Sequence, residues 1–426
     1  NKPNIIFYFS DQQRADSAGC YGQKLPVTPN LDKIAEEGTL FENAFSCQPV
    51  CGPMRACLQS GVYATQNGCY RNNIAPPADT KGIAHYLTEA GYDTAYIGKW
   101  HLASDKEHRL ATKPTPVERR GGYDYWRASD VLEFTSHGYN GYVFDENNNR
   151  LEFKGYRADK INDYAIEYIK KDHDKPFFMF ISQLEPHHQN DRLRFESPKG
   201  LKNKFKDYEV PGDLKGTIGD WRMQMPSYLA CCNRVDENFG KLIQTLKDEG
   251  IYDNTVIIYT SDHGCHFRTR NLEYKRSCHE NSIKVPLVIT GGAFTGGGKV
   301  DELVSLIDLP ATVLDIAGVK IPEHFMGKSL TDKKGHESVF MQISESQIGR
   351  AVRTDRWKYS VSAKNEDRAF ADYYTEDFLY DLKNDPYERT NLIDNPAFSQ
   401  TKSELRAILV EHMKKAGEPA LDIVVK

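Results

Sequence analysis

Short, continuous runs of apolar residues recur through the first 290 residues of this 426-residue chain. Runs of this kind are typical of strands that are buried on both faces, as the strands of parallel sheets are. The runs lie at residues 4–9, 94–97, 176–181, 255–259 and 285–289. They favour folds in which both faces of a central sheet are covered.

Segments with helical periodicity separate the apolar runs. One begins at Thr28 and Pro29, which suit a helix N-terminus, and ends at Gly38. Others are expected at 82–90, at 165–171 and from 229 to Gly250. Because helices and strands alternate, we predict an α/β fold with a large, mostly parallel sheet flanked by helices.

The pattern changes after about residue 330. A turn-rich stretch and a helix over 400–416 follow three short expected strands, at 339–341, 350–352 and 357–360. We therefore predict a larger domain over residues 1–330 and a smaller C-terminal α+β subdomain over 331–426 with an antiparallel sheet. Residues 103–150 and 189–225 lack clear periodicity, and we expect irregular insertions there, which in compact domains are usually functional or disordered.

The charge balance and the cysteine count exclude several classes of protein. Lys and Arg number 55 against 60 Asp and Glu, so the net charge is −5, which argues against a general nucleic-acid-binding protein. No apolar run approaches the ~20 residues that cross a bilayer, so no membrane span is expected. Nine cysteines are too few for a disulfide scaffold, and we expect most of them to be buried thiols.

Polar side chains follow four of the apolar runs directly. In open α/β sheets, ligands bind beyond the carboxyl ends of the strands. A single Asp or His in such a place is more often an ordinary loop end, whereas four such ends together favour a site. The polar residues are Asp11, Gln12, Lys99, His101, Glu185, His187, His188, Asp262 and His263. Four of them resemble the oxygen-rich shell of a hard cation, namely Asp11, Gln12, Asp262 and His263.

The segment Cys51-Gly-Pro53-Met-Arg55 carries the most specific local signal. Pro53 suits the first turn of a helix, which places Cys51 at the positive end of that helix. Free backbone N–H groups at such an end can hold an anion. The alternative is a buried structural cysteine beside an exposed arginine.

These segments together resemble the type I sulfatases of the alkaline phosphatase superfamily, bacterial polysaccharide sulfatases among them. Residues 51–61 match the sulfatase signature, Cys-x-Pro-x-Arg followed by Ser-Gly, and the second family motif is complete at residues 91–101. Further matches lie at residues 186–187, 262–264, 275–287 and 379–388. The motifs occur in the family's order and cover almost the whole chain.

The resemblance implies a mechanism. In the family a maturation enzyme oxidises the signature cysteine, here Cys51, to formylglycine, and the formylglycine hydrate is the nucleophile. Arg55 would stabilise the hydrate, while Lys99 and Lys275 would bind sulfate oxygens. His101 would act as the base that later expels sulfate, and His187 as the general acid for the leaving alcohol.

The resemblance also implies a divalent metal, Ca²⁺ ahead of Mn²⁺ or Mg²⁺. Its expected ligands are Asp11, Gln12, Cys51, Asp262 and His263. Gln12 and His263 stand where many sulfatases have Asp and Asn, and Met54 stands where many have a smaller residue. The Gln12 and His263 variants also occur in phosphonate and phosphate monoester hydrolases, so that activity is the first alternative.

The expected substrate is a sulfate ester on a polysaccharide-derived oligosaccharide, because aromatic, His and Arg side chains suit sugars. The candidate substrate-binding residues are His137, His188, Gln189, Asn190, His266, Arg268 and His279. Further candidates in the 103–150 insertion are Trp126, Glu133, Tyr139 and Tyr142. The alternative for many of these residues is a place in solvated loops. Which sugar and which hydroxyl carry the sulfate stays open.

A second alternative is a catalytically inactive relative that only binds carbohydrate. The intact Cys51, Arg55, Lys99 and His101 argue against it, because a binding module has no need of a nucleophile. The chain opens directly on a strand pattern, so the protein is either cytosolic or has lost a signal peptide. The expected substrate favours a periplasmic or secreted location.

Overall fold

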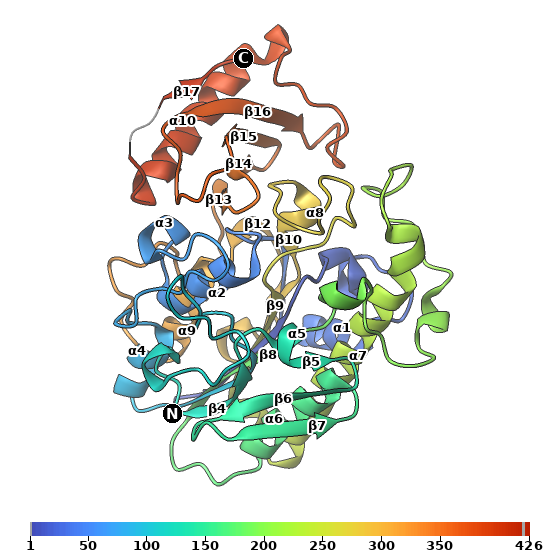
Figure 1. Ribbon diagram of the computed structural model, residues 1–426, viewed down its shortest axis with the longest axis vertical. Helices are drawn as coiled ribbons and strands as arrows, with labels where there is room; N and C mark the ends of the chain where they lie inside the picture. Colours follow the sequence, from blue (N-terminus) through green and yellow to red (C-terminus); the bar gives the residue numbers. More distant parts are fainter. Residues whose placement is uncertain (1, 420–421) are drawn as a thin grey trace.

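Strand β1 (Asn4–Ser10) is buried along its whole length at the centre of a 12-stranded sheet. Figure 1 shows the computed structural model, which describes residues 2–419 and 422–426. Strand β1 pairs in parallel with two strands, β8 (Phe177–Ser182) and β9 (Thr255–Ser261). The parallel set continues from β8 to β3 (Asp93–Lys99) and β4 (Tyr125–Ser129). The predicted α/β fold with a parallel sheet is confirmed for this centre.

Both edges of the large sheet contain antiparallel pairs. At one edge β11 (Leu287–Thr290) runs antiparallel to β9 and to β2 (Thr39–Phe45). The run predicted over 285–289 is two strands, β10 (Lys284–Val285) and β11, which are separated by Pro286. Proline has no N–H to donate to a sheet ladder, which accounts for the break. Strand β12 (Gly298–Ser305) pairs in parallel with β2.

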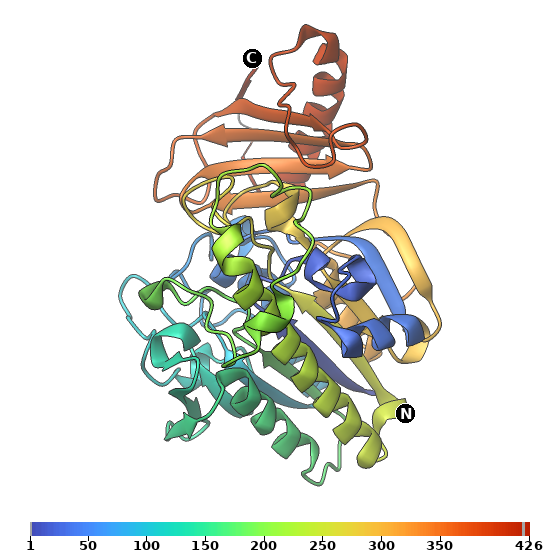
Figure 2. The ribbon, with the colours of Figure 1, turned by 90° about the vertical axis from the view of Figure 1, so that its right-hand side faces the viewer.

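Helices cover both faces of the large sheet, with one layer on each side of the strands in Figure 1, and alternate residues of β1 belong to the two cores. Figure 2 looks onto one of these helical layers. Ile6 and Tyr8 belong to the core beneath α1 (Pro29–Glu37), α6 (Arg157–Ile169) and α7 (Trp221–Asp248). Phe7 and Phe9 belong to the core on the other face, beneath α2 (Cys51–Ser60), α4 (Ile83–Glu89) and α9 (Asp308–Ile316). Shorter helices are α3 (Ala64–Asn67), α5 (Leu132–Thr135) and α8 (Glu280–Ile283).

A five-stranded sheet forms the C-terminal part of the chain. Four strands run antiparallel, and β17 (Ile423–Val424) pairs in parallel with the last of them. The terminal helix α10 (Ser399–Lys415) buries Leu405, Leu409 and Met413. The four antiparallel strands are β13 (Ser338–Ser344), β14 (Ile348–Thr354), β15 (Trp357–Ala363) and β16 (Tyr374–Asp381).

Several predicted boundaries were wrong. The 103–150 insertion, expected to be irregular, contains β4, α5, β5 (Ser136–His137) and β6 (Asn140–Asp145), and β6 forms a hairpin with β7 (Arg150–Lys154). Helices α6 and α7 each begin eight residues before their predicted starts, at Arg157 and Trp221. Strand β16 lies where a turn-rich stretch was expected, because the acidic Glu376 hides its pattern. Glu376 is buried there and accepts a hydrogen bond from Lys402.

The nine cysteines are all free thiols, and eight of them are buried. Within residues 2–419 and 422–426, none of the helices is long and apolar enough to cross a membrane.

Candidate active site

The carboxyl ends of the parallel strands bring the predicted site together. Asp11 follows β1, Lys99 ends β3, His187 follows β8 and His263 follows β9. Cys51, the first residue of α2, enters the same space with Sγ 3.4 Å from Asp11 Oδ1 and 3.4 Å from His263 Nε2. These distances place the signature cysteine beside groups that follow two strands, β1 and β9.

Cys51 is buried and faces a cation. Its Sγ lies 2.7 Å from Nζ of Lys275. Burial alone would raise the pKa of the thiol, but the ammonium groups of Lys275 and Lys99 hold this pKa well below its usual value. The site therefore stabilises negative charge at the position that a nucleophile would occupy.

Four side chains form a cluster that suits a divalent metal. Ligand atoms of Asp11, Cys51, Asp262 and His263 lie within 4.8 Å of one another, and all four residues are buried. Asp262 Oδ1 accepts hydrogen bonds from the backbone N–H groups of Gln12 and His263. Oδ2 has no hydrogen-bond partner among the described residues, and Arg55 Nη2 lies 3.7 Å from it. An unpartnered buried carboxylate oxygen is costly unless a cation or a donor meets it. The donor set therefore fits a hard or borderline divalent cation.

The orientation of His263 supports the same interpretation. Its Nδ1 lies 2.8 Å from the carbonyl oxygen of Gly264, so Nδ1 carries the proton and Nε2 presents its lone pair to the cluster. Gln12 lines the cavity that opens over Cys51, and its backbone is left-handed, with φ of 69°. Four of the five predicted metal ligands thus lie together, and Gln12 adjoins them through its backbone N–H, which donates to Asp262.

Two buried cations hold Asp11 in place. Its Oδ2 accepts hydrogen bonds from Lys99 Nζ at 2.9 Å and from Arg55 Nη2 at 3.1 Å. Arg55 also donates to Ser182 Oγ on β8. Gly98 has φ of +107°, and a Cβ there would lie 1.9 Å from Ser182 O, so glycine is required for Lys99 to reach the site from β3.

Two histidines are positioned for proton transfer. His187 Nδ1 lies 2.6 Å from its neighbour's carbonyl oxygen, which leaves Nε2 free to face Lys275 Nζ at 3.3 Å. His101 lines the cavity beside Cys51, and its buried Nδ1 has no partner among the described residues. The backbone N–H of His101 donates to the carbonyl oxygen of Asp130, so the end of β4 fixes its position.

Glu133, which the sequence placed among the sugar-binding candidates, lies inside the catalytic cluster. Its Oε2 is 2.9 Å from Lys99 Nζ and 3.7 Å from His187 Nε2. Glu133 belongs to α5, which follows β4 closely. The other site residues were identified as polar residues that follow predicted strands. Glu133 would have been identified in the same way if β4 had been recognised as a strand.

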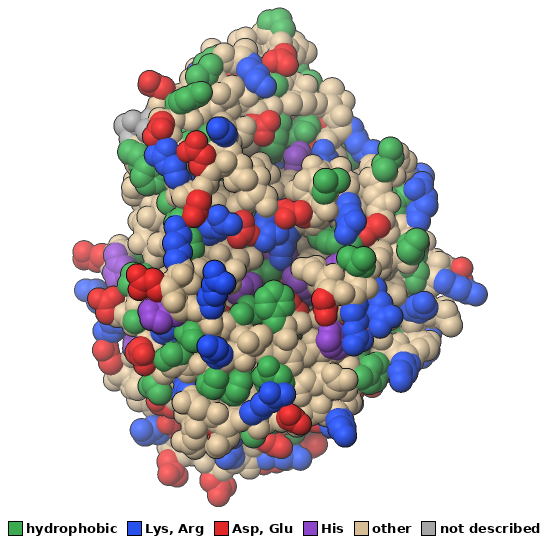
Figure 3. All heavy atoms as spheres, viewed as in Figure 1, with side chains coloured by type: hydrophobic (Ala, Val, Ile, Leu, Met, Phe, Trp, Pro, Cys, Tyr) green, Lys and Arg blue, Asp and Glu red, His purple; other side chains and the backbone are tan. Residues whose placement is uncertain are grey.

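A cavity of about 360 Å³ opens over Cys51. Figure 3 shows a hollow at the centre of this face of the molecule, with Lys, Arg and His side chains around it. Three predicted substrate-binding residues line the cavity, namely His188, Asn190 and Arg268. The sequence reasoning missed other lining residues, because they lie on loops or, for Phe134, on the four-residue helix α5, where no local pattern marks them: Asn72, Asn73, Phe134, Leu272, Tyr274 and Arg276.

Four predicted substrate-binding residues do not line this cavity. His266 is fully buried, with Nε2 3.2 Å from the carbonyl oxygen of Lys275, and so supports the Lys275 loop. His279 stacks on Phe378 of the C-terminal sheet. Gln189 is buried and donates to the carbonyl oxygen of Glu133. His137 Nε2 is hydrogen-bonded to Asp191 Oδ2 at 2.6 Å. Contacts within the protein occupy all four side chains, and the structure does not bring them into the cavity over Cys51.

The aromatic candidates in residues 103–150 also make contacts within the protein. Trp126 is fully buried on β4 and stacks on Tyr96 of β3. Tyr142 lies beneath the guanidinium group of Arg150, and Tyr139 packs edge to face against Tyr156. None of the three lines the cavity over Cys51.

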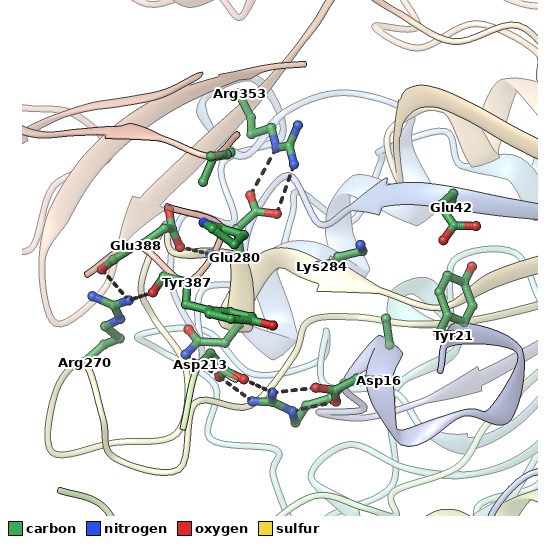
Figure 4. A pocket seen from close by; sticks show the side chains of 15 residues that line it. Asp16, Tyr21, Glu42, Asp213, Arg270, Glu280, Lys284, Arg353, Tyr387 and Glu388 are labelled. Atoms are coloured by element: carbon green, nitrogen blue, oxygen red, sulfur yellow. Dashed lines mark hydrogen bonds and ion pairs between the residues drawn. The ribbon is translucent and has the colours of Figure 1, made fainter. Parts of the chain in front are cut away.

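A second cavity, of about 310 Å³, lies where the C-terminal subdomain meets the loops of the large sheet (Figure 4). Its charged side chains largely pair with one another. Arg353 of β14 forms an ion pair with Glu280 of α8, and Arg270 donates to the carbonyl oxygens of Tyr387 and Glu388. These contacts join the C-terminal subdomain to the segments on both sides of Lys275, so we assign this cavity a structural role.

Comparison with known proteins identifies the family. The family model described as Sulfatase matches residues 3–319, and the model described as N-sulphoglucosamine sulphohydrolase, C-terminal, matches residues 271–415. The chain belongs to the sulfatase family and is a sulfuric ester hydrolase. The resemblance inferred from the motifs is therefore confirmed.

Individual relatives are similar over nearly their whole length. The uncharacterised sulfatase YidJ of Escherichia coli is 31% identical, over 98% of this chain and 88% of that protein. An N-acetylglucosamine-6-O-sulfatase of Bacteroides thetaiotaomicron is 27% identical, over 97% and 87%. A solved structure in complex with D-glucosamine-2-N,6-O-disulfate is 26% identical with a TM-score of 0.80, over 98% of both chains. The fold is that of the alkaline-phosphatase-like sulfatases.

Proposed function

We propose that this sulfatase hydrolyses a sulfate ester on a polysaccharide-derived oligosaccharide, with formylglycine formed from Cys51 as the nucleophile. The observation that carries the proposal is the contact of 2.7 Å between Lys275 Nζ and Cys51 Sγ, next to the four-residue metal cluster. Nucleophile, cation and metal ligands meet at one point, which is the arrangement that transfer of an anionic group requires.

The metal would be held by Asp11, Gln12, Asp262, His263 and the oxidised Cys51, with Ca²⁺ as the first candidate. When bound, it supplies a Lewis acid that polarises a sulfate oxygen and favours the ionised nucleophile. The formylglycine hydrate supplies one oxygen that attacks sulfur and a second whose deprotonation releases the sulfate.

The residues of the chain bind the substrate and move its protons. Lys99 and Lys275 bind the sulfate oxygens and offset the charge that develops during transfer. His187 donates a proton from Nε2 to the oxygen of the leaving alcohol as the bond between sulfur and that oxygen breaks. His101 then takes the proton of the remaining hydroxyl group. Water rehydrates the aldehyde and completes the cycle.

The surroundings of the cavity support an oligosaccharide as the substrate. Phe134 is 65% exposed at its edge, where an aromatic ring can stack on a sugar face. A third cavity adjoins the cavity over Cys51 and shares Asn72, Asn73 and Phe134 with it. This third cavity extends to three basic residues, Arg71, Lys106 and Arg109. This continuous surface leaves room for more than one sugar unit. Relatives named for sugar sulfates point to the same class.

A panel of sulfated mono- and oligosaccharides tests the substrate class, with released sulfate as the readout and 4-nitrophenyl sulfate as the reference. We expect kcat/KM on at least one oligosaccharide to exceed that on the aryl ester. Higher activity on the aryl ester than on every saccharide in the panel would contradict the proposal.

The second candidate is a phosphonate or phosphate monoester hydrolase. Gln12 and His263 at the metal cluster favour it. A phosphonate monoester hydrolase of Agrobacterium radiobacter shares the fold at 20% identity and a TM-score of 0.77. A direct comparison of kcat/KM on aryl sulfate, aryl phosphate and aryl phosphonate esters distinguishes the two activities.

A further inference from the structure

Glu133 is a buried carboxylate at the wall of the catalytic cavity. Oε2 contacts Lys99 Nζ at 2.9 Å, whereas Oε1 is buried without a hydrogen-bond partner among the described residues. The side chain is 7% exposed. A carboxylate beside the position of an anionic substrate repels that substrate, so its presence calls for a physical explanation.

The surrounding structure fixes the position of Glu133. Its carbonyl oxygen accepts a hydrogen bond of 2.9 Å from Nε2 of Gln189. Oε1 of Gln189 accepts from Arg157, which forms an ion pair with Glu185 at 3.1 Å. Burial would raise the pKa of Glu133, but Lys99, His187 and His101 lower it to about 2. Glu133 is therefore ionised at neutral pH.

The chain contributes three basic and three acidic side chains around the nucleophile. Arg55, Lys99 and Lys275 are the cations, and the buried carboxylates are Asp11, Asp262 and Glu133. Asp11 and Asp262 belong to the metal cluster. Glu133 lies outside it and contacts the groups assigned to the substrate, Lys99 and His187. It is thus the carboxylate that reduces the positive charge available to the substrate.

We propose that Glu133 is a specificity-determining residue that makes the site selective for singly charged esters. This inference rests on the proposed function of the same site. A sulfate monoester carries one negative charge, whereas a phosphate monoester carries two above its second pKa of ~6. A fixed charge interacts twice as strongly with a dianion as with a monoanion at the same position, so Glu133 penalises phosphate monoesters more than sulfate monoesters.

Three aryl esters test the proposal at a pH above ~7.5, where the phosphate monoester is a dianion. They are 4-nitrophenyl sulfate, 4-nitrophenyl phosphate and methyl 4-nitrophenyl phosphate, a diester that carries a single charge. Glu133→Gln should raise the ratio of kcat/KM for the phosphate monoester to that for the sulfate by about tenfold or more. The ratio for the diester to the sulfate should stay within about twofold, because both are monoanions.

Glu273→Gln is the matched control. Glu273 also lines the cavity, but its side chain is 38% exposed and lies 3.4 Å from Arg276, so solvent and a counter-ion screen its charge. Both ratios should therefore change little in this variant. A shift in Glu273→Gln as large as that in Glu133→Gln would contradict a specific role for Glu133.

Binding provides a second test if Glu133→Gln turns over too slowly for kinetics. The aryl sulfate and the aryl phosphate are titrated into Cys51→Ala and into Cys51→Ala/Glu133→Gln by calorimetry. The double variant should gain about tenfold in affinity for the phosphate relative to the sulfate. An unchanged ratio, or an equal loss for both esters, would overturn the proposal, because a residue that only supports the fold affects both alike.

A different result would contradict the proposed function without contradicting the role of Glu133. A wild-type enzyme that prefers the phosphate diester to the sulfate would contradict the sulfatase substrate class. It would leave the selection by charge intact, since the diester is a monoanion. The proposal about Glu133 fails only if its neutral variant does not change the relative preference for the dianion.

Discussion

The ammonium group of Lys275 lies 2.7 Å from Sγ of Cys51, although the two residues are 224 positions apart in the chain. Lys275 lies on the loop after β9, and Cys51 begins α2. Folding of the large sheet thus creates the contact between the nucleophile position and its cation. The same loop packs against the C-terminal subdomain through the ion pair between Arg353 and Glu280. The position of Lys275 therefore depends on both parts of the fold.

Replacement of Lys275 by Ala should lower kcat/KM for aryl sulfates by about 10²–10³, the usual effect of removing a group that stabilises transition-state charge. The fold should be retained, as judged by circular dichroism and thermal unfolding. Lys284→Ala is the control, because Lys284 follows the same loop but lines the second cavity. Equal losses in the two variants would show that the loop matters and that the contact with Cys51 does not.

Metal removal should abolish turnover, and Ca²⁺ or Mn²⁺ should restore it. Asp262→Asn should raise the concentration of metal required for half-maximal activity, because it removes an anionic ligand from the cluster. Metal titration of chelated wild-type and variant protein measures the effect. Full activity after exhaustive chelation, verified by elemental analysis, would contradict the metal assignment.

Arg268 should contribute to recognition of the saccharide. It lines the cavity with its guanidinium group 5.2 Å from the centre of the Tyr274 ring, and the side chain is 44% exposed. Arg268→Ala should cost about 1.5–3 kcal/mol in kcat/KM on an oligosaccharide substrate, the range for a hydrogen bond that involves a charged group. The loss on 4-nitrophenyl sulfate should be much smaller. Similar losses on both substrates would assign Arg268 to the sulfate or to the fold.

His412 should make the stability of the protein depend on pH. Its ring stacks on Phe340, and burial, helped by Lys415 and His336, lowers its pKa to about 4. In the unfolded chain the pKa is ~6.5, so the unfolded state binds more protons between these two values and stability falls as the pH drops through this range. This histidine should account for about 2 kcal/mol of lost stability between pH ~7 and ~5.

Urea unfolding at the two pH values measures this effect. His412→Gln keeps a polar group that can reach Ser338 but removes the titration, so about 2 kcal/mol of the pH dependence should disappear. His324→Gln, at an exposed histidine, should leave the pH dependence unchanged. A pH dependence that is the same in wild type and His412→Gln would contradict the assignment.

The centre of the site was predictable because it depends on a local rule. Apolar strands end in polar residues, and parallel strands end at one edge, so Asp11, Lys99, His187 and His263 could be expected to meet. Glu133 could not be placed, because the strand before it has mixed polarity and its helix is only four residues long.

The residues around the centre of the site are harder to place from the sequence, for a different reason. His266 and His279 lie close in sequence to catalytic residues, yet their rings contact the Lys275 backbone and the C-terminal sheet. The sequence suggested that Trp126 stacks on a sugar, but its ring is buried and stacks on Tyr96. Whether a polar or aromatic side chain faces a ligand or its own protein depends on long-range packing, which a local pattern does not encode.

The central claim is that formylglycine at position 51 is the nucleophile, and the mass of the peptide that contains this residue tests it most directly. Preparations with different degrees of maturation are digested, and the fraction of formylglycine is compared with the specific activity on 4-nitrophenyl sulfate. Activity should rise in proportion to that fraction and vanish when only the Cys51 thiol is present. Repeated turnover by a preparation in which Cys51 is entirely unmodified would contradict the mechanism.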